Sequence, residues 1–206
     1  MILSEREFSV RGFLRERKAL LVHFSTCMSC HESEYLFPED LRNAQSLVGK
    51  SLSFSTILQD DVGPFDANGQ PNRGNAAGCI GIVVDIRDDC VVTVGQSDDG
   101  TSFDNKTGEW ISGGKPPAPD TCAESIDARA DTNEWFVRDY TCIGIFYFYP
   151  GYARARIPVS DGMRGNEEVV ADVHVTLGGV LARFPNDRIF TAHKGAFCEF
   201  DCNEMK

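Results

Sequence analysis

Three short segments of the sequence carry side chains that could act together in catalysis. Glu134 begins the apolar run Glu-Trp-Phe-Val, where a strand would present its carboxylate to a cleft. His23 lies in the apolar segment Leu-Leu-Val-His-Phe-Ser-Thr, and Ser55 lies in the alternating segment Leu-Ser-Phe-Ser-Thr. A positioned carboxylate can stabilise developing positive charge or accept a proton, and imidazole and hydroxyl groups can orient a substrate by hydrogen bonds.

The order of these segments, a histidine on one strand, Ser/Thr on another and a glutamate at the start of a third, resembles the NAD-dependent ADP-ribosyltransferases. Further pieces of similarity are Gly-Ile-Val-Val-Asp at 81–85, Gln-Ser-Asp-Asp-Gly-Thr at 96–101 and Glu-Trp-Phe-Val at 134–137. Together they resemble the core of the DarT-type DNA ADP-ribosyltransferases over about half of the chain. The resemblance implies an ADP-ribosyltransferase-like fold and NAD as the substrate.

The resemblance also implies a role for individual residues. Glu134 would be the catalytic carboxylate beside the ribose, and His23 would hydrogen-bond the ribose hydroxyls. Phe24 or Phe54 would stack near the nicotinamide, and Arg73 or Arg42 would neutralise the diphosphate, because a guanidinium matches phosphate oxygens. The NAD-binding residues expected in this way are His23, Ser25, Phe54, Ser55, Thr56 and Arg73.

The chain departs from this pattern in three respects. Thr132 stands two residues before Glu134, where arginine-modifying relatives carry Glu or Gln. The net charge of −11 disfavours a nucleic-acid substrate, because the global field repels polyanions. Residues 151–206 form an extension without a counterpart. The acceptor of the ADP-ribosyl group, either a macromolecule or a small molecule, therefore stays open.

Cysteine pairs near both ends of the chain indicate a second kind of chemistry. Cys27-Met-Ser-Cys30-His31 and Cys198-Glu-Phe-Asp-Cys202 could supply four thiolates to a tetrahedral zinc site, with His31 or His193 as substitutes. The alternative function is thus a zinc-stabilised protein-binding module without catalysis. The spacing Cys27-x-x-Cys30-His31 is also that of haem attachment or of a redox site, but no export signal supports haem.

Composition and charge narrow the class of protein. The 206 residues suffice for one full core, and 42% of them are hydrophobic, which is typical of a globular domain. No apolar run is long enough for a transmembrane helix, and the N-terminus is too polar for a signal peptide. We therefore expect a cytoplasmic protein without a membrane partner. The resemblance to ADP-ribosyltransferases implies a role as a toxin, effector or defence element. In the alternative, a metal-stabilised binding module, the 95–119 loop would contact a protein partner, and the acidic surface would suit a basic one.

The pattern of apolar residues predicts an α+β fold: early helices followed by a mostly antiparallel, β-rich core in one domain, residues 1–206. A weak alternative boundary lies near residue 150, at a Pro-Gly pair. Ser4 is the expected N-cap of the first helix, with Glu7 at the capping-box spacing. Predicted helices cover 1–19, 38–48 and 121–130; predicted strands cover 19–24, 51–58, 79–86, 90–94, 135–149 (one or two strands, broken at Gly144), 168–177, 180–184 and 188–190. The segments 60–78 and 95–119 are expected to be long loops.

Overall fold

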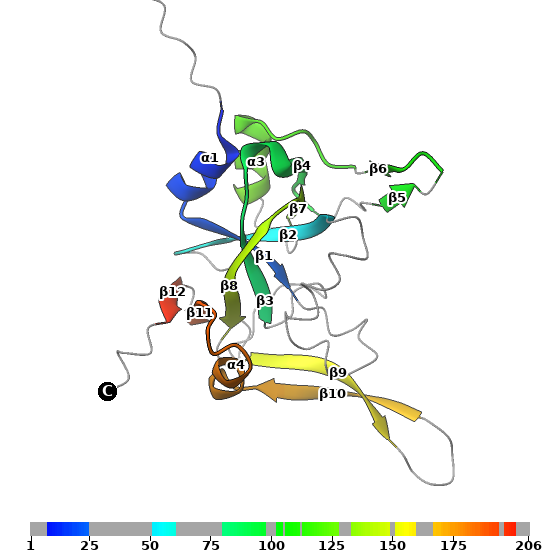
Figure 1. Ribbon diagram of the computed structural model, residues 1–206, viewed down its shortest axis with the longest axis vertical. Helices are drawn as coiled ribbons and strands as arrows, with labels where there is room; N and C mark the ends of the chain where they lie inside the picture. Colours follow the sequence, from blue (N-terminus) through cyan, green and yellow to red (C-terminus); the bar gives the residue numbers. More distant parts are fainter. Residues whose placement is uncertain are drawn as a thin grey trace, which may run out of the picture.

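The protein is built around one mixed but mostly antiparallel sheet. The computed structural model describes residues 8–24, 51–60, 80–97, 102–104, 106–111, 113–127, 133–148, 151–159, 167–193 and 196–200. Within these residues, eight strands form a sheet in the order β12-β11-β8-β3-β1-β2-β7-β4 (Figure 1). Of the neighbouring strands so described, only β8 and β11 run parallel. The predicted α+β class with a mostly antiparallel core is therefore confirmed.

The bounds of the elements follow in chain order. The strands of the large sheet are β1 (Ala19–Phe24), β2 (Ser51–Leu58), β3 (Ile80–Asp85), β4 (Val91–Gly95), β7 (Glu134–Arg138), β8 (Thr141–Phe148), β11 (Ile189–His193) and β12 (Ala196–Phe200). Two further hairpins are β5 (Ser102–Asp104) with β6 (Glu109–Ile111), and β9 (Gly151–Val159) with β10 (Glu167–Val175). The helices of the described residues are α1 (Val10–Glu16), η3 (Asp88–Cys90, a 3₁₀ turn), α3 (Pro119–Asp127) and α4 (Leu177–Arg183).

The centre of the sheet is covered on both faces. Strand β3 is buried at every position from Ile80 to Val84, which fits its uninterrupted apolar sequence. The largest fully buried side chains include Trp135 on β7, Phe54 on β2 and Tyr147 on β8, so the core extends across the sheet. Burial of these aromatic rings makes a large favourable contribution to the stability of the sheet.

Helix α1 is fixed to the sheet by charge as well as by packing. Ser9 caps the helix, with its Oγ accepting from the Gly12 amide at 2.9 Å. Arg11 Nε donates to Asp85 Oδ1 at 2.9 Å, and a second guanidinium nitrogen of Arg11 pairs with Asp85 Oδ2. This hydrogen-bonded ion pair lowers the pKa of the Asp85 carboxyl. The Arg11 amide also donates to Asp88 Oδ1 at 2.7 Å, so the start of α1 is held to the β3–β4 connection.

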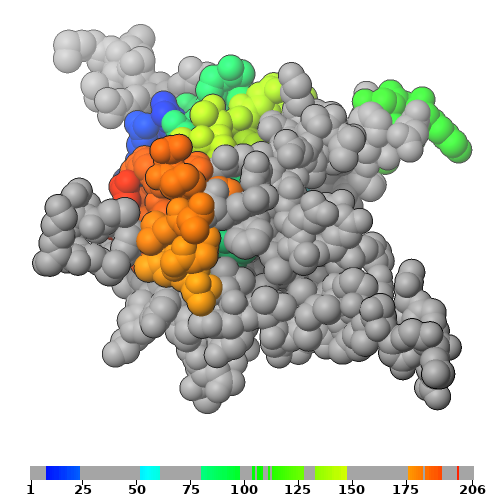
Figure 2. Space-filling view, turned by 60° about the horizontal axis from the view of Figure 1, so that its bottom comes forward, coloured from blue at the N-terminus to red at the C-terminus, as the bar shows by residue number. Residues whose placement is uncertain are grey.

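The helices lie at different parts of the sheet. Helices α1 and α3 contact each other, and they pack against β1 and β4 respectively (Figure 1). Helix α4 lies at the opposite end, beside the β9–β10 hairpin, and Figure 2 shows its segment (orange) at the surface, away from the projecting β5–β6 hairpin (green). None of the helices in the described part of the chain is long and apolar enough to cross a membrane.

Several predicted elements need correction. The N-cap of helix α1 is Ser9, whose backbone is extended, so the helix begins later than predicted; the expected cap Ser4 lies outside the described residues. Residues 180–183 belong to helix α4 and not to a strand, and Phe184 is the C-cap of this helix; Thr176 caps its start by accepting from the Gly179 amide at 3.0 Å. Gly144 lies inside β8 and does not break it; the break is at Asp139, whose φ is 53°. The segment 95–119 contains the β5–β6 hairpin, and the predicted helix at 38–48 lies outside the described residues.

Gly81 on β3 provides a test of this packing. A Cβ atom there would lie 2.6 Å from the backbone oxygen of His23 and 2.7 Å from Val22 Cγ1. We expect Gly81→Ala to lower the free energy of unfolding by about 1–3 kcal/mol, measured by urea denaturation, because the backbone of β1 would have to move away from β3 to make room for the Cβ atom. Gly178→Ala in α4 is the matched control: its Cβ would have Thr176 Oγ1 at 4.0 Å as the nearest atom, and alanine is the better helix former. Equal effects of the two substitutions would contradict the close packing of β1 on β3.

Candidate functional site

The structure places the predicted histidine, serine and glutamate on three neighbouring strands. Strand β2 lies between β1, which carries His23, and β7, which begins at Glu134. The ladder between β1 and β2 ends at the pair Val22–Ser55, and the ladder between β2 and β7 includes the pair Phe54–Trp135. Residues more than thirty positions apart are therefore brought together in the half of the sheet that ends at β4.

Ser53 on β2 joins the two candidate catalytic side chains. His23 Nδ1 lies 2.6 Å from the backbone oxygen of Ser53. The hydroxyl of the same serine donates to Glu134 Oε1. Glu134 is only 8% exposed, so its carboxylate needs such donors to offset the loss of hydration. One residue thus contacts the imidazole through its backbone and the carboxylate through its side chain.

The contact with Ser53 defines the state of the His23 ring. A backbone carbonyl only accepts, so Nδ1 carries a proton and donates. Burial lowers the pKa of His23, with the Ser53 hydrogen bond acting in the opposite direction to a smaller extent. The ring is therefore neutral at pH 7, and its Nε2 is left as a hydrogen-bond acceptor.

A buried polar network fixes the residue before Glu134. Asn133 Oδ1 accepts from the Thr56 amide at 2.8 Å, while Asn133 Nδ2 donates to the Thr56 hydroxyl and, at 3.0 Å, to the Ser125 carbonyl. This one amide connects the start of β7 to β2 and to α3. Buried networks of this kind hold their members in a single arrangement when every polar group has a partner.

The residue after Glu134 is held by the same network. Trp135 Nε1 donates to Ser125 Oγ at 2.9 Å, and Ser125 Oγ donates to the Gly95 carbonyl at 2.6 Å. Both Asn133 and Trp135 therefore face α3. Because side chains alternate along a strand, Glu134 points to the other face, where Ser53 meets it.

The imidazole and the carboxylate reach Ser53 from opposite sides of β2. The His23 and Phe54 rings meet edge to face with centroids 5.8 Å apart, and Phe54 also contacts Tyr140 at 5.0 Å. Phe54 pairs with Trp135 across the strands, so His23 lies on the α3 side and Glu134 on the opposite side. The structure brings these two residues to one serine without placing them on one face.

The remaining predicted NAD-binding residues fall into three groups. Ser55 is half-buried and shares the face of Ser53 and Glu134. Phe54 and Thr56 are buried on the other face, and the Thr56 hydroxyl accepts from Asn133. Ser25 and Arg73 lie outside the described residues, as does Arg42.

The predicted zinc site is also largely outside the described residues. This applies to Cys27, Cys30 and Cys202, while the backbone of Cys198 lies in β12. The described part of the chain contains no group of three or more His, Cys, Asp or Glu side chains that could hold a metal ion. Zinc and haem both stay untested predictions.

The described cysteines behave as buried thiols. Cys90 and Cys122 are buried and free, and Cys142 is half-buried and free. Burial raises the pKa of Cys122 to about 11, so its thiol is protonated at neutral pH and a poor nucleophile. Buried reduced cysteines of this kind pack as small apolar core residues.

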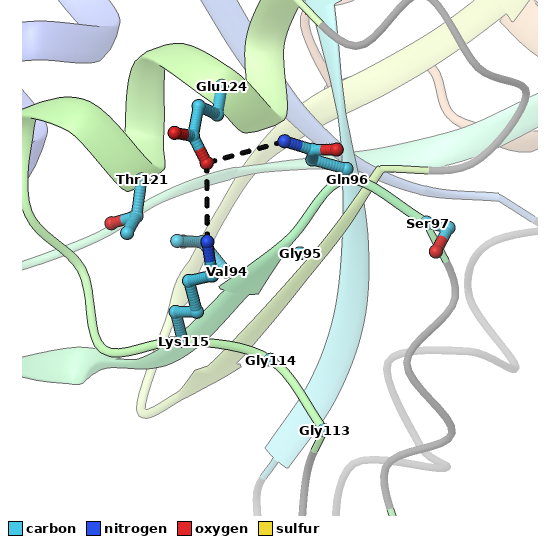
Figure 3. A pocket seen from close by; sticks show the side chains of 9 residues that line it. All are labelled: Val94, Gly95, Gln96, Ser97, Gly113, Gly114, Lys115, Thr121 and Glu124. Carbon is cyan, nitrogen blue, oxygen red and sulfur yellow. Dashed lines mark hydrogen bonds and ion pairs between the residues drawn. The ribbon is translucent and has the colours of Figure 1, made fainter.

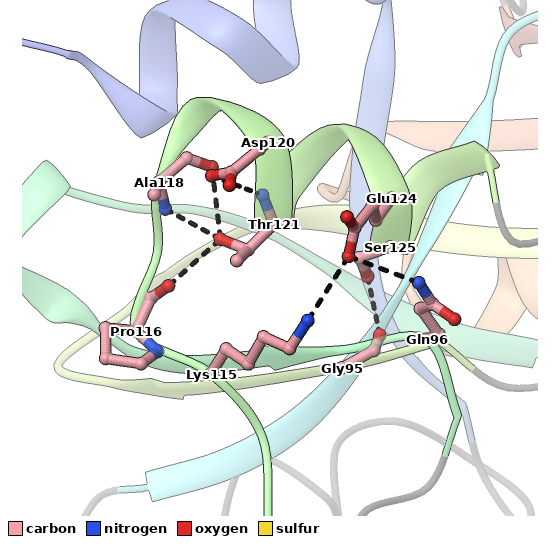
Figure 4. Close-up of polar contacts among 9 residues, drawn as sticks. All are labelled: Gly95, Gln96, Lys115, Pro116, Ala118, Asp120, Thr121, Glu124 and Ser125. Carbon is pink, nitrogen blue, oxygen red and sulfur yellow. Dashed lines mark hydrogen bonds and ion pairs between the residues drawn. The ribbon is translucent and has the colours of Figure 1, made fainter.

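A polar pocket lies beside the strand that carries Glu134. It has a volume of about 230 Å³ and is lined by residues 94–97, by residues 113–115 and by Thr121 and Glu124 of α3 (Figure 3). Gly95, in its wall, pairs with Glu134 across the β4–β7 ladder. Glu124 Oε2 accepts from Gln96 Nε2 at 3.3 Å and from Lys115 Nζ at 3.4 Å (Figure 4).

Sequence reasoning missed Ser53, Asn133 and Ser125. Ser53 had a usable signal, because period-two alternation puts it on the same face as Ser55. Asn133 and Ser125 had none, since their partners are a strand and a helix that only the fold brings together.

Comparison of the chain with protein-family models gave no match. Comparisons with curated proteins and with solved structures gave no match either. The function of this site is therefore argued from its own geometry and chemistry.

The lowered pKa of His23 makes a prediction about stability. The unfolded chain binds a proton at this residue below about pH 6.5 while the folded chain does not, so stability due to His23 is complete above that pH. It is lost as the pH falls towards the lower pKa of the folded state, with a slope of up to about 1.4 kcal/mol per pH unit.

The variant His23→Asn keeps a donor for the Ser53 carbonyl but does not titrate. Between pH 7 and pH 5, as measured by urea unfolding, we expect its stability to fall less steeply than that of the wild type. Because the two proteins differ only at residue 23, the contributions of the other histidines to the pH dependence of stability cancel in the comparison. Parallel curves would contradict a buried, neutral His23.

Proposed function

We propose that this protein is an NAD-dependent ADP-ribosyltransferase of the toxin, effector or defence type, with Glu134 as its catalytic carboxylate. The observation that supports this most directly is the arrangement at Ser53, which accepts from His23 and donates to Glu134. The expected residues His23, Ser55 and Glu134 lie on the adjacent strands β1, β2 and β7, which is compatible with the order of segments that suggested the activity from the sequence. An ADP-ribosyltransferase-like fold is part of the same proposal.

The reaction needs a group that stabilises positive charge on a ribose. The bond between the ribose C1′ and the nicotinamide nitrogen breaks, and its electron pair leaves with nicotinamide. The acceptor then forms a bond to C1′, and the proton it loses passes to a base. A carboxylate at Glu134 serves both needs, because it stabilises the cationic transition state and can take the proton.

Ser53 acts as a positioning residue in this scheme. Its hydroxyl donates to one carboxylate oxygen of Glu134 and so restricts the orientation of the carboxylate. His23 holds the backbone of the same serine from the opposite face of the sheet, so in this geometry it supports Ser53 and does not contact the ribose beside Glu134. Ser55, on the face of Glu134, is the expected NAD contact that this geometry favours most.

The proposal is tested by release of nicotinamide from NAD, with and without cell extract as a source of acceptor. We expect Glu134→Gln to reduce the rate by about 100-fold or more, because the amide cannot carry the negative charge. Glu16→Gln, the same change at an exposed position of α1, is the control and should leave the rate unchanged. Wild-type protein that is folded and releases no nicotinamide under either condition would reject the proposal.

Ser53 gives a second, independent prediction. Ser53→Ala should lower kcat by about 10- to 100-fold with a smaller effect on KM, because the carboxylate loses its orienting donor. Ser53→Thr keeps the hydroxyl and should restore most of kcat. A purely structural serine would behave differently: both variants would then lose activity only in proportion to the folded fraction, monitored by circular dichroism.

A further inference from the structure

We propose that the pocket between β4, residues 113–115 and α3 binds the guanidinium group of an arginine side chain on a protein partner. The pocket lies on the side of the sheet covered by α3 and is open to solvent (Figure 3). Its volume of about 230 Å³ is sufficient for one long side chain. This inference does not depend on NAD chemistry at Glu134.

The acceptor of the pocket is Glu124, and its present partners are weak. Lys115 Nζ at 3.4 Å and Gln96 Nε2 at 3.3 Å are both at the long limit of hydrogen bonding. The side chains of Lys115 and Glu124 are 66% and 49% exposed, so water screens their attraction. A cation that binds Glu124 more closely can therefore displace Lys115.

Lys115 shows that this position attracts a cation. Its backbone is fixed, because it exchanges two hydrogen bonds with Val94, of 2.8 Å and 2.9 Å. Its side chain alone extends across the pocket to Glu124 (Figure 4). The ammonium group thus occupies the place that an external cation would take, and it can swing into solvent without any change in the fold.

A guanidinium suits this pocket better than a metal ion or an ammonium group. The pocket offers one carboxylate, and the described residues contain no cluster of three metal-binding side chains. A guanidinium can bind Glu124 with two parallel hydrogen bonds and still donate to a neighbouring oxygen. The Gln96 amide can turn its oxygen towards that donor, and the Ser97 hydroxyl lines the same wall.

The walls of the pocket are rigid, which lowers the cost of binding. Thr121 Oγ1 accepts from the Ala118 amide at 2.8 Å and donates to the Pro116 carbonyl at 2.9 Å (Figure 4). These bonds hold the turn that leads from Lys115 into α3. Gly114 packs so closely on β4 that a Cβ atom would lie 2.9 Å from Thr93 Cβ. A preformed site of this kind loses little conformational entropy when it is filled.

The charge around the pocket favours a basic protein partner. Helix α3 carries Asp120, Glu124 and Asp127 and no basic residue in its last turn. The whole chain has a net charge of −11, which accelerates encounter with positively charged surfaces. Gly113 and Gly114 leave one wall without side chains, so the backbone of a bound segment can approach closely.

The proposal is tested with the peptide acetyl-Gly-Arg-Gly-amide and its citrulline isostere, which has the same shape without the charge. Amide chemical-shift changes in ¹⁵N-labelled protein report binding. We expect the arginine peptide to shift residues 95–97, 113–115 and 121–124, and the citrulline peptide to shift none of them. Glu124→Gln should weaken binding by about 10-fold or more, and Lys115→Met should strengthen it several-fold by removing the internal competitor.

The control is Asp127→Asn, which removes a negative charge from the same helix outside the pocket and should change Kd by less than about two-fold. Equal shifts with the arginine and citrulline peptides would overturn the proposal. So would unchanged binding in Glu124→Gln, weaker binding in Lys115→Met, or preferential binding of acetyl-Gly-Glu-Gly-amide, which would make Lys115 the ligand. Thermal unfolding of each variant confirms that a loss of binding is not a loss of fold.

Discussion

The side-chain amide of Asn133 is the constraint on which the rest of the site depends. It hydrogen-bonds the amide and the hydroxyl of Thr56 and the carbonyl of Ser125, and so joins β2, β7 and α3 in the interior. Trp135 and Gly95 complete the same network through the Ser125 hydroxyl. In an apolar core these hydrogen bonds admit few alternatives, because a displaced partner would leave a buried polar atom unpaired.

The position of Glu134 follows from this network. Its two neighbours in sequence are directed towards α3, so the pleat of the strand turns the carboxylate to the other face. There the Ser53 hydroxyl donates a hydrogen bond to the carboxylate. The face on which the carboxylate lies is thus set by the buried network, and Ser53 helps to orient it.

The pattern of apolar residues along the sequence predicted the fold class and the positions of strands β1 and β2 correctly. Both strands are marked by consecutive residues, β1 by an apolar run and β2 by alternation of polar and apolar side chains. The same approach failed at residues 180–184, where apolar residues occur in a helix as readily as in a strand and the cap at Thr176 decides the outcome. It identified Glu134 and His23 as candidates but not Ser53 as their link. That link depends on the cross-strand register. The register is set by pairing between distant segments and cannot be deduced from any one short stretch of sequence.

The parallel pairing of β8 with β11 has a consequence for how the chain can vary. Parallel neighbours cannot be joined by a tight turn, so the chain must leave the sheet after β8 and return to start β11 beside it. The β9–β10 hairpin belongs to the connection between β8 and β11. It forms a separate two-stranded sheet and does not pair with β1, β2 or β7. Changes in its length would alter the outline of the molecule while the strands bearing His23, Ser53 and Glu134 keep their pairing.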